Sequence, residues 1–189
     1  MDLPDKKYNI IYADPPWSYR DKCNAGKRGA SHKYKTQSLD WLCSLPVKDI
    51  AADDCVLFMW VTMPKLFEGP ELVMKAWGFE PKTNGFLWVK RNKITPSWFW
   101  GMGRWTRANP ELCLLATRGK PKRISASVHS VIDSPIRKHS QKPDETRDRI
   151  VELCGDLPRI ELFARQRTPG WDAWGNEVER WKQKTSREY

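Results

Sequence analysis

Four consecutive residues near the start of the chain, Asp14-Pro15-Pro16-Trp17, have the composition of a site for an aromatic amine. The two prolines remove two backbone donors and fix the chain, so we expect the carbonyl oxygens around them to stay out of a strand ladder. The Asp14 carboxylate and the Pro15 carbonyl would then offer two acceptors to one amino group, and Trp17 would offer a flat apolar face. The segment predicts a pocket for an amino group on a planar aromatic ring.

Adenine carries such an amino group, and its chemistry explains why two acceptors would be needed. The amine is a poor nucleophile because its lone pair is delocalised into the ring. Acceptors that hold its hydrogens favour a pyramidal nitrogen and stabilise the positive charge that develops during attack on a methylsulfonium. Positioning supplies most of the acceleration of such an in-line transfer, and a base in a duplex must first be unstacked. The alternative interpretation is an ordinary turn after a strand, with Trp17 in the core.

The net charge favours a polyanionic partner. The 189 residues include 33 Lys and Arg against 23 Asp and Glu, a formal net charge of +10. Phosphates that bind such a surface release condensed counterions, which favours nucleic acid, although a generally basic surface is the alternative. The chain also has 11 tryptophans, more than a core of this size usually needs. We expect some of them to be stacking surfaces.

Other classes of protein are disfavoured by the composition. No apolar run approaches the length of a membrane span, and the first residues are too polar for a signal peptide, so we expect a cytoplasmic protein with no membrane partner. Five scattered cysteines without close pairing predict reduced, packed thiols. With only three histidines in addition, we expect no metal site.

Short apolar runs alternate with helical segments along the chain. We expect strands at 8–14, 55–61, 85–90, 111–117, 127–132 and 158–164, and helices at 38–45, 64–77, 143–154 and 177–184. Gly69 and Pro70 should break or kink the second of these helices. This alternation predicts an α/β fold with a single doubly wound, mostly parallel sheet. Ligands of such sheets bind beyond the carboxyl ends of the strands, which here are followed by the turns after Asp14 and Ala164.

Eight segments, taken in order, resemble one known family. They are residues 13–17, 57–62, 87–92, 101–105, 111–113, 139–145, 160–165 and 175–176. Together they resemble the MT-A70 family of adenine N6-methyltransferases, which includes the catalytic subunit of the eukaryotic mRNA adenosine methylase and smaller bacterial and phage enzymes. The resemblance spans roughly residues 8–180. It implies a Rossmann-like fold that uses S-adenosylmethionine, with the catalytic motif N-terminal and the cofactor motif C-terminal.

The resemblance also implies roles for individual residues. Asp14 and Pro15 would hold the target amine, while Pro16 and Trp17 would shape its pocket. The implied cofactor contacts are Asp14, Lys142, Arg165, Arg167, Thr168, Asn176 and Glu177, with Asn176 at the ribose hydroxyls. The implied substrate contacts are Lys33, Tyr34, Lys35, Trp60, Lys90, Asn92 and Trp105, and Tyr34 looks like the loop tyrosine that gates base and cofactor. From the residues alone, Arg165 and Arg167 could equally be solvated side chains.

Three features of the chain differ from the sequence of the mRNA enzyme or from the glycine-rich loop of nucleotide-binding proteins. Pro110 stands where the mRNA enzyme carries a lysine near the cofactor, which removes one implied contact. Glu177 replaces a glutamine, so it would contact the ribose only as an acceptor. A Gly-x-Gly-x-x-Gly loop is missing after the predicted strands, which is consistent with a cofactor that has no phosphates.

We therefore expect an S-adenosylmethionine-dependent enzyme that methylates the N6 amine of adenine in nucleic acid. The compact format is similar to bacterial and phage members, which favours DNA over RNA. We expect a single domain over residues 1–189 without a separate target-recognition domain. Recognition would then come from basic loops at 20–35, 91–107 and 118–123, of which the second is also rich in tryptophan.

Several alternatives stay open. The substrate could be RNA, or another planar amine such as cytosine or a protein glutamine amide, although the related enzymes for those amines carry Ser or Asn in place of Asp14. A non-catalytic nucleic-acid-binding subunit is the alternative outside enzymes, and the intact motif at residues 14–17 argues against it. The chain could act as a monomer, as a homodimer or with another protein.

Overall fold

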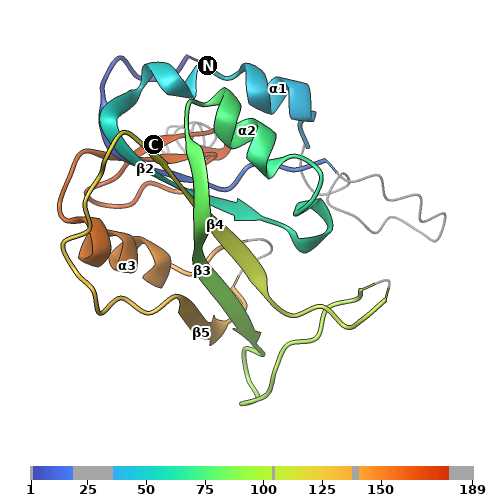
Figure 1. Cartoon of the computed structure of the whole chain (residues 1–189). Coiled ribbons are helices and arrows are strands. Elements are labelled where there is room, and N and C mark those ends of the chain that lie inside the picture. The colour runs from blue at the N-terminus through green and yellow to red at the C-terminus, as the bar shows by residue number, and fades with distance from the viewer. Residues whose placement is uncertain (1, 19–35, 104, 138–140, 179–189) are drawn as a thin grey trace, which may run out of the picture.

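A computed structural model describes residues 2–18, 36–103, 105–137 and 141–178 of the chain (Figure 1). The helices are α1 (Leu39–Ser44), α2 (Pro70–Ala76) and α3 (Glu145–Cys154), with 3₁₀ turns at Val47–Asp49 and Met63–Lys65. The strands are β1 (Tyr8–Ala13), β2 (Ala51–Val61), β3 (Glu80–Arg91), β4 (Glu111–Arg118), β5 (Val131–Pro135), β6 (Arg159–Leu162) and β7 (Asp172–Trp174).

The strands form one mixed sheet in the order β5-β3-β4-β2-β1-β6-β7. Strand β1 pairs in parallel with β2 and with β6, β6 pairs in parallel with β7, and β3 pairs in parallel with β5. Strand β4 runs antiparallel to both of its neighbours, β2 and β3. The predicted α/β class and the mostly parallel sheet are confirmed.

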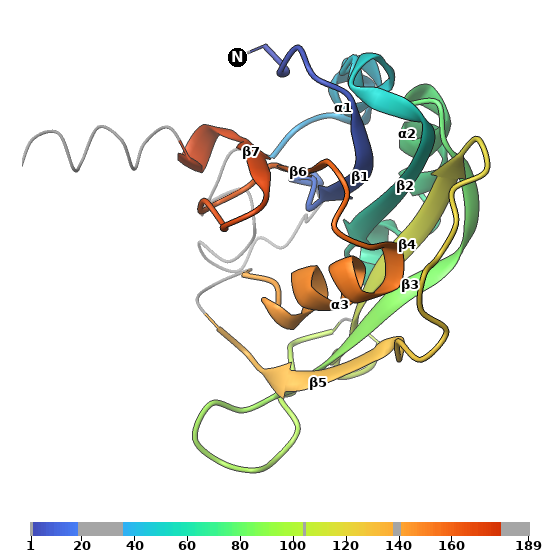
Figure 2. The same ribbon diagram turned by 90° about the vertical axis from the view of Figure 1, so that its left-hand side faces the viewer.

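Helices cover both faces of this sheet, with α1 and α2 on one side and α3 on the other (Figures 1 and 2). Successive side chains of a strand point to opposite faces. Ile11 and Leu57 therefore belong to the core under α1 and α2, whereas Tyr12 and Phe58 belong to the core under α3. Strands buried on both faces read as continuous apolar runs, which is why β1 and β2 were recognisable in the sequence.

Capping and helix-breaking residues in the sequence predicted some of the helix and strand ends correctly, but not all of them. Ser38 caps α1 as predicted, because its Oγ accepts a hydrogen bond from Trp41 N at 3.1 Å. The helix predicted at 64–77 is divided, and α2 begins at Pro70, a position where a missing N–H costs nothing. Strand β7 was not predicted. The helix predicted at 177–184 starts at residue 176 and leaves the described residues after 178.

The carboxyl ends of β1, β2 and β6 meet at one edge of the sheet, and antiparallel β4 begins at the same edge. The register pairs Val61 with Leu112 at this edge and Cys55 with Arg118 near the opposite edge. Six residues of strand, about 20 Å, lie between the two levels. Strand β4 therefore carries the basic stretch 118–123 away from Asp14, and its part in recognising the nucleic acid stays a prediction.

In the part of the chain that the structure describes, no helix has both the length and the apolar character needed to cross a lipid bilayer.

A buried ion pair joins α3 to the sheet and gives a test of the packing. Arg147 Nε and Nη2 each donate to one carboxylate oxygen of Glu161 at 2.8 Å, and both side chains are buried. The variant Arg147→Met should lower the free energy of unfolding by about 3–5 kcal/mol, because it leaves the Glu161 carboxylate buried without its counter-charge. Urea denaturation followed by circular dichroism measures this loss.

Two further variants make the experiment specific. Replacing both partners, Arg147→Met with Glu161→Leu, should restore much of the lost stability, because no charge then stays buried. Lys75→Met removes the lysine of an exposed pair with Glu71 and should leave the denaturation midpoint unchanged. An Arg147→Met protein as stable as the parent would contradict the proposed contribution of the pair.

Candidate active site

Asp14 lies directly after β1, at the edge where the carboxyl ends of the parallel strands meet. Its Oδ2 atom accepts a hydrogen bond from Lys142 Nζ at 2.7 Å. Burial raises the pKa of the Asp14 carboxyl, and the positive charges of Lys142 and Arg165 oppose that rise. The predicted catalytic acid and two predicted cofactor residues are therefore close neighbours.

The ion pair continues into a chain of four alternating charges. Lys142 Nζ lies 3.3 Å from Glu111 Oε2, and Lys90 Nζ donates to Glu111 Oε1 at 2.6 Å. Burial by itself would lower the pKa of Lys142, but the attraction of Asp14 and Glu111 raises it. Burial by itself would raise the pKa of Glu111, but Lys142 and Lys90 lower it. Lys142 and Glu111 are thus held in their charged forms beside Asp14.

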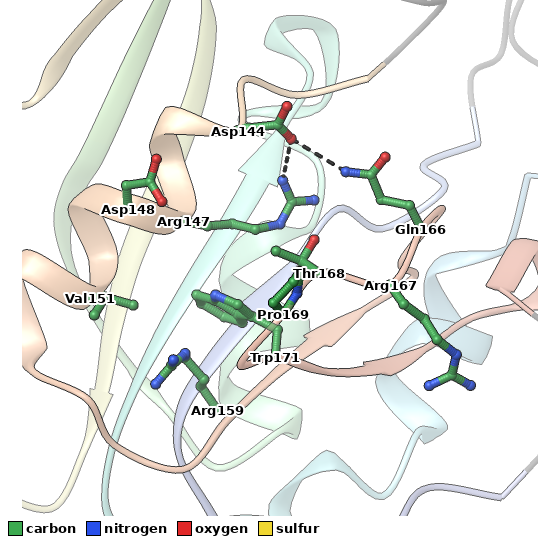
Figure 3. A pocket seen from close by; sticks show the side chains of 10 residues that line it. All are labelled: Asp144, Arg147, Asp148, Val151, Arg159, Gln166, Arg167, Thr168, Pro169 and Trp171. Atoms are coloured by element: carbon green, nitrogen blue, oxygen red, sulfur yellow. Dashed lines mark hydrogen bonds and ion pairs between the residues drawn. The ribbon is translucent and has the colours of Figure 1, made fainter.

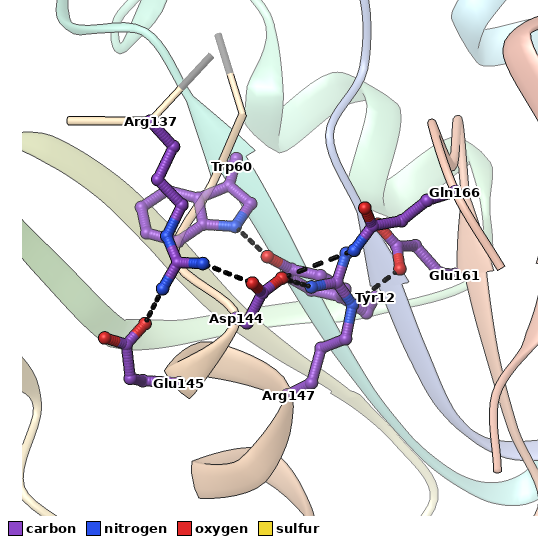
Figure 4. A network of polar contacts seen from close by, with 8 residues as sticks. All are labelled: Tyr12, Trp60, Arg137, Asp144, Glu145, Arg147, Glu161 and Gln166. Atoms are coloured by element: carbon purple, nitrogen blue, oxygen red, sulfur yellow. Dashed lines mark hydrogen bonds and ion pairs between the residues drawn. The ribbon is translucent and has the colours of Figure 1, made fainter. Parts of the chain in front are cut away.

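Asp144 fixes the segment that carries Lys142 (Figure 4). One of its oxygens accepts a hydrogen bond from Arg147 Nη1 at 2.8 Å and one from Gln166 Nε2 at 3.4 Å. The other oxygen pairs with Arg137, which also donates to Glu145 at 3.0 Å. These contacts fasten the start of α3 to the loop that follows β6. Lys142, two residues earlier, is held toward Asp14 as a result.

Two expectations about the Asp-Pro-Pro-Trp segment need correction. The two proline carbonyls are not free of backbone bonding, because Pro15 O accepts from Trp17 N at 2.8 Å and Pro16 O accepts from Gln37 N at 2.9 Å. A carbonyl oxygen has two lone pairs, so that of Pro15 can still accept a second hydrogen bond. Trp17 does not present an open face, since only 5 % of it is exposed and its Nε1 donates to Trp60 O at 2.9 Å.

Two residues predicted to contact the substrate, Trp60 and Lys90, have hydrogen-bond partners within the protein. Trp60 is enclosed in the core under α3, with 1 % of its surface exposed, and its Nε1 donates to Tyr12 Oη at 2.6 Å. No face of Trp60 is open to a base, so its prediction as a substrate contact is corrected. Lys90 donates a hydrogen bond to Glu111 at 2.6 Å, and its role as a substrate contact stays a prediction. Glu111 itself was not singled out from the sequence, since its role depends on Lys142.

The other predicted substrate residues lie in loops. Asn92 donates to Ser97 Oγ at 2.8 Å and to Trp98 O at 3.1 Å, so it stabilises its own loop. Trp105 is almost fully solvent-exposed. The remaining three lie outside the described residues: Lys33, Tyr34 and Lys35.

Five of the seven predicted cofactor residues follow two neighbouring parallel strands, β6 and β7. Leu162 pairs with Trp174, and Ala164 N donates to Trp174 O at 3.0 Å. A Cβ atom on Gly175 would lie 2.8 Å from the backbone N and O of Ala164, so only glycine lets the two strand ends approach this closely. The structure thereby brings together the segment 165–168 and the pair Asn176 and Glu177.

Phe163, the residue between β6 and this segment, was missed in the sequence. Its φ is 61°, and it is the only non-glycine residue with positive φ in the described part of the chain. Aromatic contacts hold it there, with ring centroids 5.4 Å from Trp174, 6.4 Å from Trp41 and 6.5 Å from Trp77. Strain of about 1–3 kcal/mol of this kind concentrates at functional sites. The residue type gives no signal of it, because tertiary contacts impose it.

A cavity of about 460 Å³ opens between α3 and the loop after β6 (Figure 3). Arg167 and Thr168, two predicted cofactor residues, line it together with Asp144, Gln166 and Trp171. The Thr168 hydroxyl oxygen is buried and has no hydrogen-bond partner among the described residues. An unsatisfied buried hydroxyl costs about 1–3 kcal/mol, so a ligand or a water molecule that bonds to it is favoured.

The charged and polar side chains at this edge fit S-adenosylmethionine. Its carboxylate suits arginine, its cationic groups suit Asp14, and its ribose hydroxyls suit an amide and a carboxylate such as those of Asn176 and Glu177. Among the described residues, no group of three or more His, Cys, Asp or Glu is placed to hold a metal ion.

The fold and the position of the site are typical of α/β enzymes that bind their ligands at the carboxyl ends of parallel strands. Residues 8–177 match the model of the MT-A70 family, and the chain belongs to this family. It is therefore an S-adenosylmethionine-dependent adenine N6-methyltransferase, as the motif resemblance predicted.

Individual relatives agree with this assignment. The type II methyltransferase M.MunI of Mycoplasma sp is 38% identical over 194 residues, which cover 93% of this chain and 80% of the relative. The N(6)-adenosine-methyltransferase catalytic subunit METTL3 of Homo sapiens is 30% identical over 177 residues, which cover 92% of this chain and 28% of the relative. The MT-A70-like protein of Drosophila melanogaster matches with the same identity over 27% of its length. The chain thus spans little more than a quarter of these two animal proteins.

The charge chain predicts a pH dependence. The carboxylate form of Asp14 accepts hydrogen bonds, so activity should fall as the pH drops through its pKa. Lys142 lowers that pKa, so Lys142→Met should raise it and move the acid limb of the kcat/KM profile to higher pH. A displacement of about one pH unit corresponds to 1.4 kcal/mol of lost attraction. Steady-state rates measured across pH, on protein shown to be folded by circular dichroism, provide the check.

Lys90→Met is the matched control for this experiment. It removes the cation at the far end of the chain of charges, which is hydrogen-bonded to Glu111 rather than to Asp14. Its acid limb should move less than that of Lys142→Met. An acid limb that stays in place when Lys142 is replaced would show that this lysine does not set the charge of Asp14.

Proposed function

We propose that this chain methylates the N6 amine of adenine in DNA, with Asp14 and Pro15 as the two acceptors that hold the amine. The observation that carries the proposal is the Asp14–Lys142 ion pair at the carboxyl edge of the sheet. Lys142 donates to Oδ2 of the acid, and Oδ1 would accept a hydrogen from the amine. The second lone pair of the Pro15 carbonyl would accept the other hydrogen.

This arrangement would activate the amine in two ways. Holding both hydrogens favours a pyramidal nitrogen and stabilises the charge that develops on it. S-adenosylmethionine, when bound, supplies the electrophilic methyl group. The methylated nitrogen must then release a proton, and Asp14 is suited to receive it because burial raises the pKa of its carboxyl.

The cofactor would lie between the segments that follow β6 and β7. Arg165 and Arg167 would hold its carboxylate, the buried Thr168 hydroxyl would gain a partner, and Asn176 and Glu177 would hold the ribose. Lys142 has a carboxylate on either side, from Asp14 and from Glu111. We therefore propose that Lys142 acts mainly by positioning Asp14.

In this proposal the sheet is a doubly wound, Rossmann-like methyltransferase fold. The catalytic motif follows β1 and the cofactor motif follows β6 and β7. The described residues then form one methyltransferase domain. The cytoplasmic location and the choice between a monomer and a homodimer stay predictions.

DNA is favoured over RNA by the relatives. The relative that the chain matches over 80% of its length is named a type II methyltransferase, a designation used for DNA-modifying enzymes. The relatives named as adenosine methyltransferases share only about a quarter of their length with this chain. RNA stays the alternative substrate, because both groups of relatives match more than 90% of this chain.

Asp14→Asn tests the catalytic assignment. The amide keeps the shape of the side chain but removes its negative charge and one acceptor, so kcat should fall about 100- to 1,000-fold. Transfer of a radiolabelled methyl group to DNA that the parent enzyme methylates measures this loss, and nucleoside analysis of the product identifies N6-methyladenine. An Asp14→Asn enzyme with the turnover of the parent would show that the acid is misassigned.

Matched RNA oligonucleotides in the same assay decide between DNA and RNA as the substrate. Faster methyl transfer to RNA than to DNA would overturn the DNA proposal.

The basic loops predict a strong salt dependence of DNA binding. Each phosphate that a lysine or arginine neutralises contributes about one to the slope of log affinity against log salt. Replacing Lys93 and Arg107 with alanine should therefore reduce the slope by about two on a short duplex. Replacing Lys122 and Arg123, which follow β4 at the opposite edge of the sheet, should leave it unchanged. Filter binding over a range of salt concentrations measures the slopes, and an affinity of the parent that does not vary with salt contradicts the prediction.

A further inference from the structure

The loop between β3 and β4, residues 92–110, is firmly held at its base; we name it the tryptophan loop. Asn109 is buried at this base, and its Nδ2 donates to Lys90 O at 2.9 Å and to Phe99 O at 2.6 Å. Its Oδ1 accepts from Lys90 N at 2.9 Å. The backbone of Gly101 pairs with that of Ala108 farther out. These hydrogen bonds therefore fix the conformation of the base of the tryptophan loop.

The tip of the same loop carries apolar side chains that are largely exposed to solvent. Trp105 is 96% exposed and Met102 is 77% exposed. Trp98 differs from them, because the guanidinium of Arg91 lies 3.5 Å from its ring centroid and Asp133 in turn holds that guanidinium. The contact with Arg91 accounts for the position of Trp98, whereas no contact among the described residues accounts for a tryptophan at 105.

The charge of the segment identifies the class of partner. Residues 91–110 contain four basic residues and no acidic one. Aromatic and basic side chains together fit a stack of bases on an anionic backbone, whereas an apolar protein surface would not require the positive charge. Charge complementarity therefore assigns the tip to nucleic acid.

The tryptophan loop also begins at the active site. Lys90, the last residue but one of β3, is joined to Asp14 through Glu111 and Lys142. The Asp14 side chain is only 20% exposed, so a base that remains in a duplex stack cannot reach it. The adenine must leave the stack, which costs a few kcal/mol of lost stacking and pairing.

We propose that Trp105 enters the slot that the target adenine leaves in the DNA duplex and stacks on the bases above and below it, with Met102 beside it. Inserted apolar side chains stabilise unstacked steps in this way, and stacking of one base on an aromatic ring contributes about 1–3 kcal/mol. This inference rests on the proposed function, because it requires that adenine in DNA is the substrate. Trp105 is thus a determinant of activity on duplexes, distinct from the residues that hold the amine.

Methylation of one sequence in two forms tests the proposal. The parent enzyme and the variant Trp105→Ala are compared on a duplex that the parent methylates and on the single strand that contains the target adenine. On the duplex, kcat/KM should fall 10- to 100-fold, because the slot loses its stacking partner. On the single strand, the change should stay within about threefold. Trp105→Phe keeps a ring and should recover much of the duplex activity.

Fluorescence gives a second readout that does not depend on turnover. With 2-aminopurine at the target position of the duplex, binding of the parent should increase the emission, because the base leaves the stack. Trp105→Ala should bind the duplex with a smaller increase at saturation. Ile124→Ala is the matched control, since this exposed residue contacts the last turn of α3 through Leu153 O, away from Asp14, and it should behave as the parent does.

The outcomes separate the two proposals. A loss of equal size on duplex and single strand, or no loss on either, overturns the role of Trp105 while the proposed function stands. An emission increase equal to that of the parent in Trp105→Ala also overturns it. A parent enzyme that methylates no DNA of either form overturns the proposed function, and the role of Trp105 fails with it.

Discussion

The ion pair between Lys142 and Asp14 is the constraint on which the rest of the site depends. It joins residues 128 positions apart at a spacing of 2.7 Å. Buried charges are costly, and replacing such pairs with apolar residues often leaves stability unchanged or raises it. The pair is therefore better explained by the need for an oriented carboxylate at the end of β1 than by the stability of the fold. Asp144 and its arginine partners serve the same end, since they hold the segment from which Lys142 reaches the acid.

The antiparallel strand β4 supplies what a fully parallel sheet could not. Because β4 runs against β2, its first residue, Glu111, lies at the edge where β1 and β2 end. A parallel strand in that place would have carried Glu111 to the opposite edge, and Lys142 would have lost its second carboxylate. The same reversal starts the tryptophan loop at this edge. The antiparallel direction of β4 thus places both the chain of four charges and the tryptophan loop at the same edge of the sheet.

The sequence was informative wherever a local pattern decides the outcome. The apolar runs of β1 and β4, the Ser38 cap and the acid after the first strand could all be predicted from neighbouring residues. Tryptophans show the limit, since the same residue type is 1% exposed at position 60 and 96% exposed at position 105. The partnership of Lys90 with Glu111 and the positive φ of Phe163 were equally out of reach. Each is imposed by residues that are distant in the chain and adjacent only after folding.

The partly buried Asp14 and the exposed Trp105 both bear on the free-energy cost of moving adenine out of the duplex. A carboxylate that is to hold an amine strongly must be shielded from water, because solvent weakens its electrostatic interactions. Shielding places Asp14 beyond the reach of a stacked base, so adenine has to be drawn out of the duplex. The loss of stacking is then offset partly in the pocket and partly in the DNA itself, where an aromatic side chain replaces the missing base. Asn109 fastens the tryptophan loop to β3, the strand that carries Lys90. The residues that would hold the adenine and the residue that would replace it in the DNA are therefore fixed relative to each other.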